Sequence, residues 1–573
     1  MKAVGRLDFH PALIAACRDY SMEKFRKDLV AGIVVGIVAL PLAIAFAIAS
    51  GVSPTVGLVT AVIGGFIVSA FGGNTVQIGG PTGAFIVIIY NIIQVYGLTG
   101  LAMATFMAGC ILLLMGLFHL GTVIKFIPYP IVVGFTAGIA LTIFSTQMPD
   151  FFGLHITEQV PGDFIGKWRV YIANFNTIDI ATLAVGLLAL LINIVTPKIS
   201  SKLPGALTAI VLVTLATWIM REFMGVSGIE TIGDRFGNLS PSMPQVANLG
   251  FNMQTVNLLL PSAFTIAMLG AIESLLSATV ADGRTGDRTN CNTELMGQGL
   301  ANVIVPIFGG IPVTGAIART MTNITNGGKT PVAGIVHALV LLGVFMFAMS
   351  LINMVPMSCL AAVLIMVSYN MSGWRTVVDM VHNPKGDLSV MLVTFLLTVV
   401  FNLTIAIEIG LLLAVVMFLR RVTENTTIKV YGEQLDAAED TDLSKHEVLN
   451  LNPGVSVYEI DGPFFFGAAT KFDEMMRITP QEKPIVRIIR MRKVPFIDST
   501  GIHNLKLLIE SSHSEGILIV LSGVRDNVRA SLHMAGVDGL IGNEHICNHI
   551  SSAVVVANRI AAEHTMVAQS AEQ

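Results

Sequence analysis

The chain has 573 residues, of which 53% are hydrophobic and only 13% are charged. A soluble globular protein carries roughly 25% charged residues, so this composition excludes a chain made only of soluble domains. The net charge of −4 argues against a nucleic-acid partner. Five scattered cysteines without CxxC spacing argue against a disulfide framework or a zinc site, and we expect no metal.

The chain begins with a charged segment, residues 1–28, which has no short apolar run followed by a cleavage site and which we take as a cytoplasmic N-terminal segment. Residues 29–124 contain no Asp, Glu, Lys or Arg. One bilayer span needs about 20 apolar residues, so this run can cross a membrane several times. Apolar stretches continue to about residue 419, which predicts a transmembrane domain over residues 29–421 with about fourteen segments.

Basic residues predict the orientation of these segments, because Lys and Arg concentrate in cytoplasmic loops. With about fourteen spans, the basic residues outside the longer loops fall on one side: Arg26, Lys27, Lys125, Lys198, Lys202, Arg284, Arg288, Lys329, Arg375, Lys385, Arg420 and Arg421. That side is predicted to be the cytoplasm, with both termini in it. The protein is then a multi-pass membrane protein, in contact with lipid.

After residue 420 charged residues become frequent and apolar runs become short. Residues 455–460, 485–489 and 517–521 are predicted strands, and residues 502–510 and 527–535 are predicted amphipathic helices. Alternating strands and helices predict a small α/β domain, which we place at residues 446–565. The acidic segment 422–445 is predicted to be a linker and residues 566–573 a tail.

Two stretches of the apolar part resemble each other, GGPTGA at residues 79–84 and GIPVTGA at residues 310–316. Thr-Gly-Ala recurs at Thr82 and Thr314, and the same offset relates Gly51 to Gly283. The predicted spans ending at Gly51 and Gly283 run in opposite directions, so the two halves would be inverted copies. Inverted repeats are typical of secondary transporters, whose substrate site lies at the midplane.

Residues 74–80, which end in two glycines before Pro81, and residues 309–313, with two glycines and Pro312, are unsuited to a continuous helix. Each stretch precedes a possible half-helix, residues 82–95 and 314–325. A half-helix that begins in the membrane points unpaired N–H groups and a positive dipole end at its centre, which attracts an anion. Small residues would let the anion approach the backbone: Gly83, Ala84, Gly315 and Ala316. The alternative is that these small residues only allow close helix packing.

Glu273 is surrounded by apolar residues in the stretch 263–280, and an ionisable group at this depth is functional by default. Ser277 lies four residues further on, on the same predicted helix face, where the pair could hold a proton or a sodium ion. The alternative is that Glu273 pairs structurally with Arg319. Arg319, a little over one turn into the second half-helix, would either add positive potential for an anion or form an ion pair with Glu273 or Glu294.

Several motifs resemble those of the sulfate permease (SulP) family of anion transporters. They are DLVAG at residues 28–32, LP at 40–41, ASGVSP at 49–54, GPT at 80–82, NTELMGQG at 292–299 and ART at 318–320. FIDSTG at residues 496–501 is similar to the core motif of a STAS domain. Within the family the chain looks most like a bacterial branch that transports C4-dicarboxylates such as succinate.

The resemblance implies an all-α polytopic membrane domain of seven plus seven inverted segments with two half-helices, and a cytoplasmic α/β STAS domain. It also implies a core domain that moves against a gate domain, usually in a homodimer. It assigns substrate binding to Phe46, Thr82, Gly83 and the stretch Thr314, Gly315, Ala316, Ile317, Ala318 and Arg319. It assigns cation coupling to Glu273, with Ser277 as its polar neighbour. Leu42 also matches a substrate position, although some relatives carry a polar residue there, and Phe46 stands where relatives commonly have Tyr.

Ser499 matches the serine that is phosphorylated in stand-alone STAS regulators, whereas the alternative is that the motif caps a helix. The domain would stabilise a dimer or bind a cytoplasmic partner. No nucleophile–base arrangement or phosphate-binding loop supports an enzyme, and no cofactor is expected.

The sequence thus predicts a secondary active transporter for a small anion, coupled to H⁺ or Na⁺ and preferring C4-dicarboxylates, with a sulfate or bicarbonate symporter as the alternative. Two other classes compete with this prediction. They are an uncoupled anion exchanger or channel, which needs no coupling acid, and a membrane-anchored regulator, which needs no midplane site.

Overall fold

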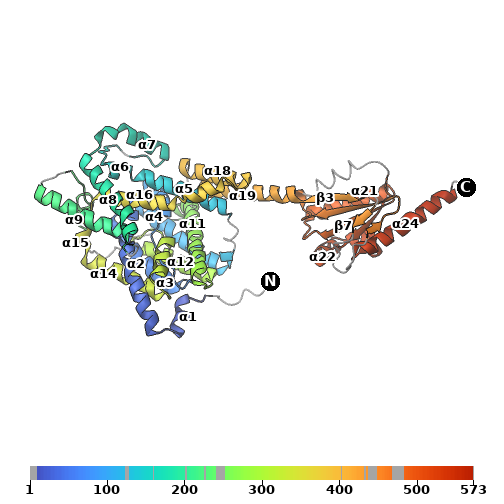
Figure 1. Ribbon diagram of the computed structural model, residues 1–573, viewed down its shortest axis with the longest axis horizontal. Helices are drawn as coiled ribbons and strands as arrows, with labels where there is room; N and C mark the ends of the chain where they lie inside the picture. The colour runs from blue at the N-terminus through green and yellow to red at the C-terminus, as the bar shows by residue number, and fades with distance from the viewer. Residues whose placement is uncertain are drawn as a thin grey trace. The chain divides into compact units, whose positions relative to one another are not determined.

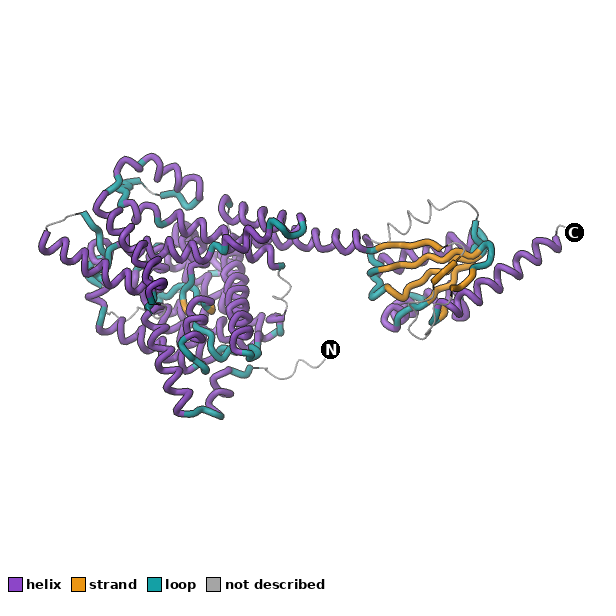
Figure 2. The backbone as a smooth tube through the Cα atoms, viewed as in Figure 1, coloured by secondary structure: helices purple, strands orange, loops and turns teal. Residues whose placement is uncertain are grey.

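The computed structural model describes residues 9–122, 128–158, 160–200, 203–224, 228–239, 252–401, 403–431, 434–436, 448–467 and 483–571. The chain divides into two units, Met1–Ala414 and Val415–Gln573. The first unit is helical and the second combines helices with a sheet (Figures 1 and 2). This confirms the predicted fold class.

The first unit contains the following elements up to the middle of its chain: α1 (Ala12–Arg18), α2 (Met22–Ala49), α3 (Pro54–Phe71), β1 (Gly79–Gly80), η1 (Gly83–Phe85), α4 (Ile86–Leu117), α5 (Tyr129–Thr146), α6 (Met148–Phe152), α7 (Phe164–Ala173), η3 (Phe175–Thr177), α8 (Ile180–Ile199), α9 (Gly205–Met224) and α10 (Ile232–Phe236). It continues with α11 (Met253–Thr285), α12 (Cys291–Ile304), η4 (Val305–Phe308), β2 (Thr314–Gly315), α13 (Ile317–Thr325), α14 (Val332–Phe347), α15 (Met349–Ile352), α16 (Met357–Met371), α17 (Trp374–Met380), α18 (Lys385–Val400) and α19 (Leu403–Asn425), which crosses into the second unit.

The second unit contains β3 (Thr427–Tyr431), β4 (Gln434–Asp436), β5 (Val448–Asn450), β6 (Val455–Asp461), β7 (Val486–Lys493), α21 (Ser499–Ser514), β8 (Leu518–Ser522), α22 (Asp526–Met534), α23 (Val537–Ile541), η5 (Asn543–His545), β9 (Ile546–Cys547) and α24 (Ile550–Ala571).

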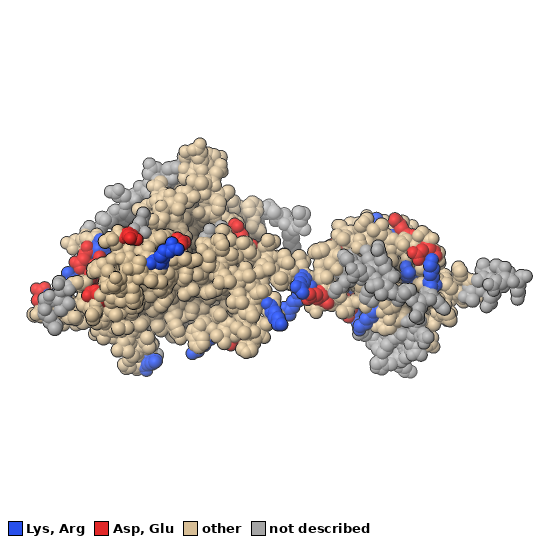
Figure 3. Space-filling view, turned by 90° about the horizontal axis from the view of Figure 1, so that it is seen from above, with Lys and Arg blue, Asp and Glu red and all other residues tan. Residues whose placement is uncertain are grey.

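Among the described residues, eight helices are long and apolar enough to cross a membrane. One of these stretches, Gly83–Leu117, holds two helical segments, because Gly97 has φ 67° and interrupts α4. Charged side chains are sparse over the face of the first unit seen in Figure 3, as expected for a surface in contact with lipid.

Glycines bring helices of the two sequence halves into close contact. A Cβ on Gly32 of α2 would lie 2.5 Å from the carbonyl oxygen of Ala333 in α14. A Cβ on Gly109 of α4 would lie 2.6 Å from the backbone nitrogen of Val303 in α12. Small residues allow this backbone approach between membrane helices, where packing rather than the hydrophobic effect drives association. The two halves therefore interlock.

Asp28 lies inside the first long helix and not at the end of a separate segment, because α2 begins at Met22. Ser21 caps this helix by accepting a hydrogen bond from the backbone nitrogen of Lys24 at 3.3 Å. The buried Asp28 carboxylate accepts the N–H groups of Lys329 at 2.7 Å and Thr330 at 3.1 Å. The start of α2 is thereby fixed to the loop that follows α13.

The second unit is built on a five-stranded sheet in the order β3-β6-β7-β8-β9, in which β3 is antiparallel and the other pairs are parallel. Alternate residues of its strands point to opposite faces. Ile460 and Ile489 pack on one face with Leu505 of α21, whereas Val457 and Ile488 pack on the other with α24. The three predicted strands and two predicted helices correspond to β6, β7, β8, α21 and α22.

The structure differs from the predicted boundaries of this unit. β3 falls within the range expected to be a linker, yet it pairs with β6 over five residues, Thr427 to Tyr431. Alternation of Ile428 and Val430 with polar residues is a strand pattern that the acidic composition of the neighbouring stretch obscures. Residues 432–433 and 437–445 of the expected linker lie outside the described residues, and α24 extends to Ala571 within the expected tail.

Candidate functional site

Two short strands from opposite halves of the first unit meet inside it. β1 pairs antiparallel with β2, with Gly79 opposite Gly315 and Gly80 opposite Thr314. Each strand leads directly into a helix start, Gly83 of η1 and Ile317 of α13. Each preceding helix ends at a glycine, since Gly72 is the C-cap of α3 and Gly309, in the left-handed conformation, is the C-cap of η4. The structure therefore shows both predicted helix breaks. It also brings the segment that contains Thr82 close to the segment that contains Thr314, as predicted.

A cavity of about 390 Å³ opens beside the two helix starts. One wall comes from α2, η1, α11 and α13, and the other from α5 and α16. The lining residues are Leu42, Phe46, Thr82, Gly83, Ala84, Val132, Phe135, Thr136, Ile272, Glu273, Leu276, Ala316, Ile317, Ala318, Arg319, Val367, Asn370 and Met371. Most of this lining is apolar, with one acidic and one basic side chain.

Glu273 of α11 reaches the cavity and contacts the first half-helix start. Its Oε2 accepts a hydrogen bond from the Thr82 hydroxyl at 3.2 Å. Thr82 is itself the residue before η1 and is 9% exposed. The carboxylate therefore lies at the end of one half-helix, although α11 comes from the other half of the sequence.

Arg319 is buried, with 2% of its surface exposed, and its guanidinium points at the first strand. Nη1 donates to the Gly79 carbonyl at 3.4 Å and Nη2 donates to the Pro81 carbonyl. Within the described residues no ion pair joins Arg319 to Glu273 or Glu294. The positive charge of Arg319 is therefore held at the cavity by carbonyl oxygens and is not cancelled by a carboxylate in direct contact.

Glu294 has a structural environment, without the ion pair to Arg319 that the sequence left open. Its Oε2 accepts the N–H groups of Gly73 at 2.8 Å and Asn74 at 3.1 Å, and its Oε1 accepts from the Gln298 amide at 2.8 Å. These bonds close the turn after α3 onto α12. Glu294 is fully buried and does not line the cavity.

Ser277 does not line the cavity beside Glu273. Its hydroxyl donates to the Thr320 hydroxyl at 3.3 Å, and the same Thr320 oxygen accepts the Ile78 N–H at 3.1 Å. Four residues along a helix correspond to a rotation of about 40°, which is enough to turn Ser277 from the cavity to α13. Ser277 thus contacts Thr320 of α13, and no described hydrogen bond joins its hydroxyl to the Glu273 carboxylate.

Thr314 and Gly315 also lie behind the cavity wall. The Thr314 hydroxyl contacts the Ser274 hydroxyl at 2.7 Å, and the Gly315 N–H donates to the same Ser274 oxygen at 3.1 Å. Ser274 was missed in the sequence, where only its place next to Glu273 in an apolar helix distinguishes it. Of the predicted substrate residues, the cavity therefore includes Phe46, Thr82, Gly83, Ala316, Ile317, Ala318 and Arg319, without Thr314 and Gly315.

The second wall of the cavity was also missed. α5 and α16 contribute apolar side chains, together with Thr136 and Asn370. Asn370, near the end of an apolar helix, is the one lining amide that a search for polar residues in apolar runs could have found. The apolar residues carry no such signal, since they resemble any membrane-helix residue.

In the second unit, Asp498 and not Ser499 caps α21. The Asp498 carboxylate accepts the Gly501 N–H at 2.7 Å and the Phe466 N–H at 3.3 Å. Ser499 is the first residue of the helix and is exposed. The capping role predicted for this motif belongs to Asp498, which leaves the Ser499 hydroxyl accessible from solvent.

Comparisons with known proteins agree with this architecture. The model of the sulfate permease family matches residues 25–394, and that of the STAS domain matches residues 448–553. "Putative sulfate transporter YvdB" of Bacillus subtilis is 40% identical over 93% of this chain and 98% of its own length. Bicarbonate transporter BicA of Picosynechococcus is 32% identical over 78% of this chain and 79% of its own.

Two solved structures share the fold. Murine Slc26a9, an anion transporter captured in the inward-facing state, superposes with a TM-score of 0.83 at 18% identity and covers 95% of this chain and 93% of its own. The transmembrane domain of a cyanobacterial BicA gives a TM-score of 0.60 at 29% identity and covers 69% of this chain and 98% of its own. The relatives are named for sulfate and bicarbonate, which does not support the expected C4-dicarboxylate branch. The chain belongs to the sulfate permease family and carries a C-terminal STAS domain.

Proposed function

We propose that this protein is a secondary active transporter that carries a small anion together with H⁺ or Na⁺ across a bacterial inner membrane. The observation that supports it most is the cavity in which two half-helix starts, Arg319 and Glu273 meet. A membrane anchor for a regulatory domain does not need two helix starts, an arginine and a glutamate around one cavity, and neither does simple helix packing.

The anion is bound by the helix starts and Arg319. The first-turn N–H groups at Gly83 and Ile317 carry partial positive charge, which favours an anion. Arg319 adds a full positive charge, and its guanidinium is held in place by the Gly79 and Pro81 carbonyl oxygens. In the mostly apolar cavity these charges are screened less than in water, so they attract an anion more strongly.

Glu273 couples the transport. As a carboxylate it would repel a bound anion across the same cavity. A proton or a sodium ion on Glu273 removes this repulsion, so loading of the cation and loading of the anion favour each other. Thr82, whose hydroxyl donates to Glu273 and which occupies the N-cap position of η1, connects the two binding events. Ser277 does not touch the cation or the anion in this proposal. It is a positioning residue that holds Thr320, which in turn accepts the Ile78 N–H just before β1.

Transport requires the wall formed by α2, η1, α11 and α13 to move against the wall formed by α5 and α16, in alternating access. Val132 and Thr136 belong to the first turns of α5, and Asn370 and Met371 to the last turn of α16. In the predicted orientation these ends are cytoplasmic. The cavity then corresponds to an inward-open state.

The relatives favour sulfate or bicarbonate as the anion, because YvdB and BicA are named for these substrates. The cavity volume of about 390 Å³ and its apolar lining favour a C4-dicarboxylate as the second candidate. A larger organic anion would use the apolar walls, whereas an inorganic oxyanion would use only the polar end.

The protein is also proposed to work as a homodimer, with both termini and the STAS domain in the cytoplasm, where the domain would bind a partner. Exposed apolar side chains on α8 and α9, such as Leu187, Leu191 and Leu215, fit contact with lipid or a second copy. Native mass spectrometry of the detergent-solubilised protein should give the mass of two chains.

Uptake into proteoliposomes tests the proposed function. Labelled sulfate, bicarbonate, succinate, fumarate and aspartate should be compared as substrates and competitors across a series of pH and Na⁺ gradients. We expect one anion to accumulate against its own gradient when a cation gradient is imposed. Uptake that only equilibrates the anion under every gradient would support an uncoupled exchanger or channel instead.

A further inference from the structure

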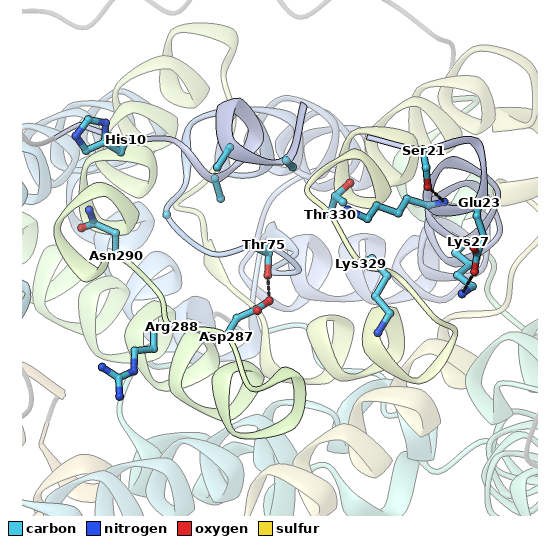
Figure 4. Close-up of a pocket in the computed structure, with 15 residues that line it drawn as sticks. His10, Ser21, Glu23, Lys27, Thr75, Asp287, Arg288, Asn290, Lys329 and Thr330 are labelled. Atoms are coloured by element: carbon cyan, nitrogen blue, oxygen red, sulfur yellow. Dashed lines mark hydrogen bonds and ion pairs between the residues drawn. The ribbon is translucent and has the colours of Figure 1, made fainter. Parts of the chain in front are cut away.

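A second hollow in the first unit, which we call the N-terminal pocket, shares no residue with the transport cavity. Its volume is about 660 Å³. Figure 4 shows that its walls come from four places in the chain: the segment from His10 to Lys27, the loop after α3, the loop between α11 and α12, and the loop after α13. These segments belong to both halves of the inverted repeat.

The N-terminal pocket carries an excess of positive charge. Four basic side chains line it, Lys24, Lys27, Arg288 and Lys329, against two acidic ones, Glu23 and Asp287. Lys27 is paired with Glu23 at 2.6 Å, and the Lys24 ammonium donates to the Asp19 carbonyl at 2.9 Å. Asp287 accepts the Thr75 hydroxyl at 2.9 Å.

Arg288 and Lys329 are the basic groups that remain available. Both are exposed, and within the described residues no hydrogen bond or ion pair holds either side chain. Figure 4 shows them on either side of Asp287, with Lys329 on the side of Lys27 and Arg288 on the side of Asn290, its side chain pointing away from Asp287. Because both side chains are exposed, they can turn toward a ligand between these positions, which a guanidinium from one loop and an ammonium from another would then reach.

The backbone around the N-terminal pocket is fixed before any ligand binds. The Lys329 N–H is held by Asp28 at 2.7 Å, and the Ala12 N–H donates to the Gly72 carbonyl at 2.9 Å. Asn290 caps α12 by accepting the Asn292 N–H at 3.2 Å and the Thr293 N–H at 3.1 Å. Preorganised walls reduce the ordering cost of binding.

We propose that the N-terminal pocket binds the phosphate group of an anionic ligand, held by Arg288 and Lys329 and supported by Lys24. Guanidinium and ammonium groups are the usual protein partners of phosphate. The phosphate belongs either to a phospholipid headgroup or to a free phosphate compound. Exposed Ile14, Met22 and Phe25 lie on the adjacent helices, which suits the boundary between lipid and water.

Binding is tested on the full chain, purified and placed in nanodiscs. The lipid probe is phosphatidylglycerol against a phosphatidylcholine background, and the soluble probe is inorganic pyrophosphate added to phosphatidylcholine nanodiscs. The thermal unfolding midpoint is followed as each probe is titrated. The double variant Arg288→Gln with Lys329→Gln keeps the backbone bond of residue 329 to Asp28. Its matched control is Arg284→Gln with Lys385→Gln, which removes two exposed basic side chains outside the pocket.

We expect at least one probe to raise the midpoint of the wild type and of the control, with an apparent affinity about tenfold weaker in the double variant. The probe that does so identifies the source of the phosphate. Asp287→Asn removes a negative charge that would repel the phosphate, so it should tighten binding of the same probe. This second variant keeps the test valid if the double variant fails to fold. The proposal is overturned if neither probe shifts the wild type, if the control loses as much affinity as the double variant, or if Asp287→Asn weakens binding.

Discussion

Gly80 lies directly opposite Thr314 where β1 and β2 pair, at the point where the two halves of the membrane domain cross. Gly80 has φ +148°, a conformation that other residues rarely adopt, and a Cβ there would overlap the Arg319 guanidinium. The backbone at this crossing therefore determines where the one buried arginine of the cavity can lie.

Gly80→Ala should displace Arg319 and strain the crossing. The positive φ alone costs about 1–3 kcal/mol, and the overlap with Arg319 adds to it. We expect anion uptake to fall at least about tenfold, with a lower unfolding midpoint. Gly343→Ala is the control, because a Cβ at Gly343 in α14 meets no atom within 4 Å. Equal uptake by the two variants would show that the crossing does not position Arg319 for transport.

Ser274→Ala should weaken the crossing from behind the cavity. The Ser274 hydroxyl bonds both the Thr314 hydroxyl and the Gly315 N–H, and all three groups are buried. Leaving a buried N–H without its acceptor costs about 1–3 kcal/mol. Ser277→Ala removes only the bond to Thr320, outside the cavity. Anion uptake should fall in Ser274→Ala. In Ser277→Ala, the dependence of anion uptake on the cation gradient should be the same as in the wild type.

A shift in that dependence for Ser277→Ala would place Ser277 in the cation site after all. The measurement is initial uptake at a series of imposed pH and Na⁺ gradients, normalised to the amount of protein in the liposomes. Thermal unfolding of each purified variant separates a loss of fold from a loss of transport.

In the STAS domain, Asp498→Ala should destabilise α21 and Ser499→Ala should not. Asp498 accepts the Gly501 N–H as an N-cap, and loss of such a cap costs about 0.5–2 kcal/mol. The exposed Ser499 makes no comparable bond within the described residues. Hydrogen exchange of the first-turn amides of α21, measured on the full chain, should become faster only in the Asp498 variant.

Tyr20 should titrate at unusually high pH. Burial, followed by the nearby Asp28 carboxylate, raises the pKa of Tyr20 to about 12, and its hydroxyl donates to Asp28 at 3.1 Å. Because the folded state favours the protonated phenol, its contribution to stability is complete below the ordinary pKa of about 10 and is lost as the pH rises towards 12. The phenolate absorbance that Tyr20→Phe removes should therefore appear near the upper end of this range. Its appearance near pH 10 would contradict the contact with Asp28.

Much of this arrangement could be predicted from sequence because it depends on local signals. The Gly/Pro clusters indicated the two helix breaks, the recurrence of Thr-Gly-Ala indicated that they correspond, and the isolation of Glu273 in an apolar helix indicated a buried acid. The period-two and helical patterns after residue 455 similarly predicted β6, β7 and α21.

The rest of the site could not be predicted, because it depends on which way each side chain faces after the helices have packed. The spacing of Glu273 and Ser277 predicted a shared face, but the cavity lies on the side of α11 that Ser277 turns away from. Thr314 and Gly315 match the binding motif, yet the strand pairing turns them towards Ser274. Val132 and Phe135 of the second wall carry no polar signal, so only tertiary packing identifies them.

The coupling role of Glu273 is the central claim, and Glu273→Gln tests it most directly. The amide keeps the size and can still accept the Thr82 hydroxyl, but it cannot be protonated or hold Na⁺ as a carboxylate does. Glu408→Gln, which changes an exposed acid of α19, is the control. In proteoliposomes with an imposed cation gradient, we expect the control to accumulate the labelled anion and Glu273→Gln to equilibrate it without accumulation. Accumulation by Glu273→Gln at the wild-type level would contradict the account.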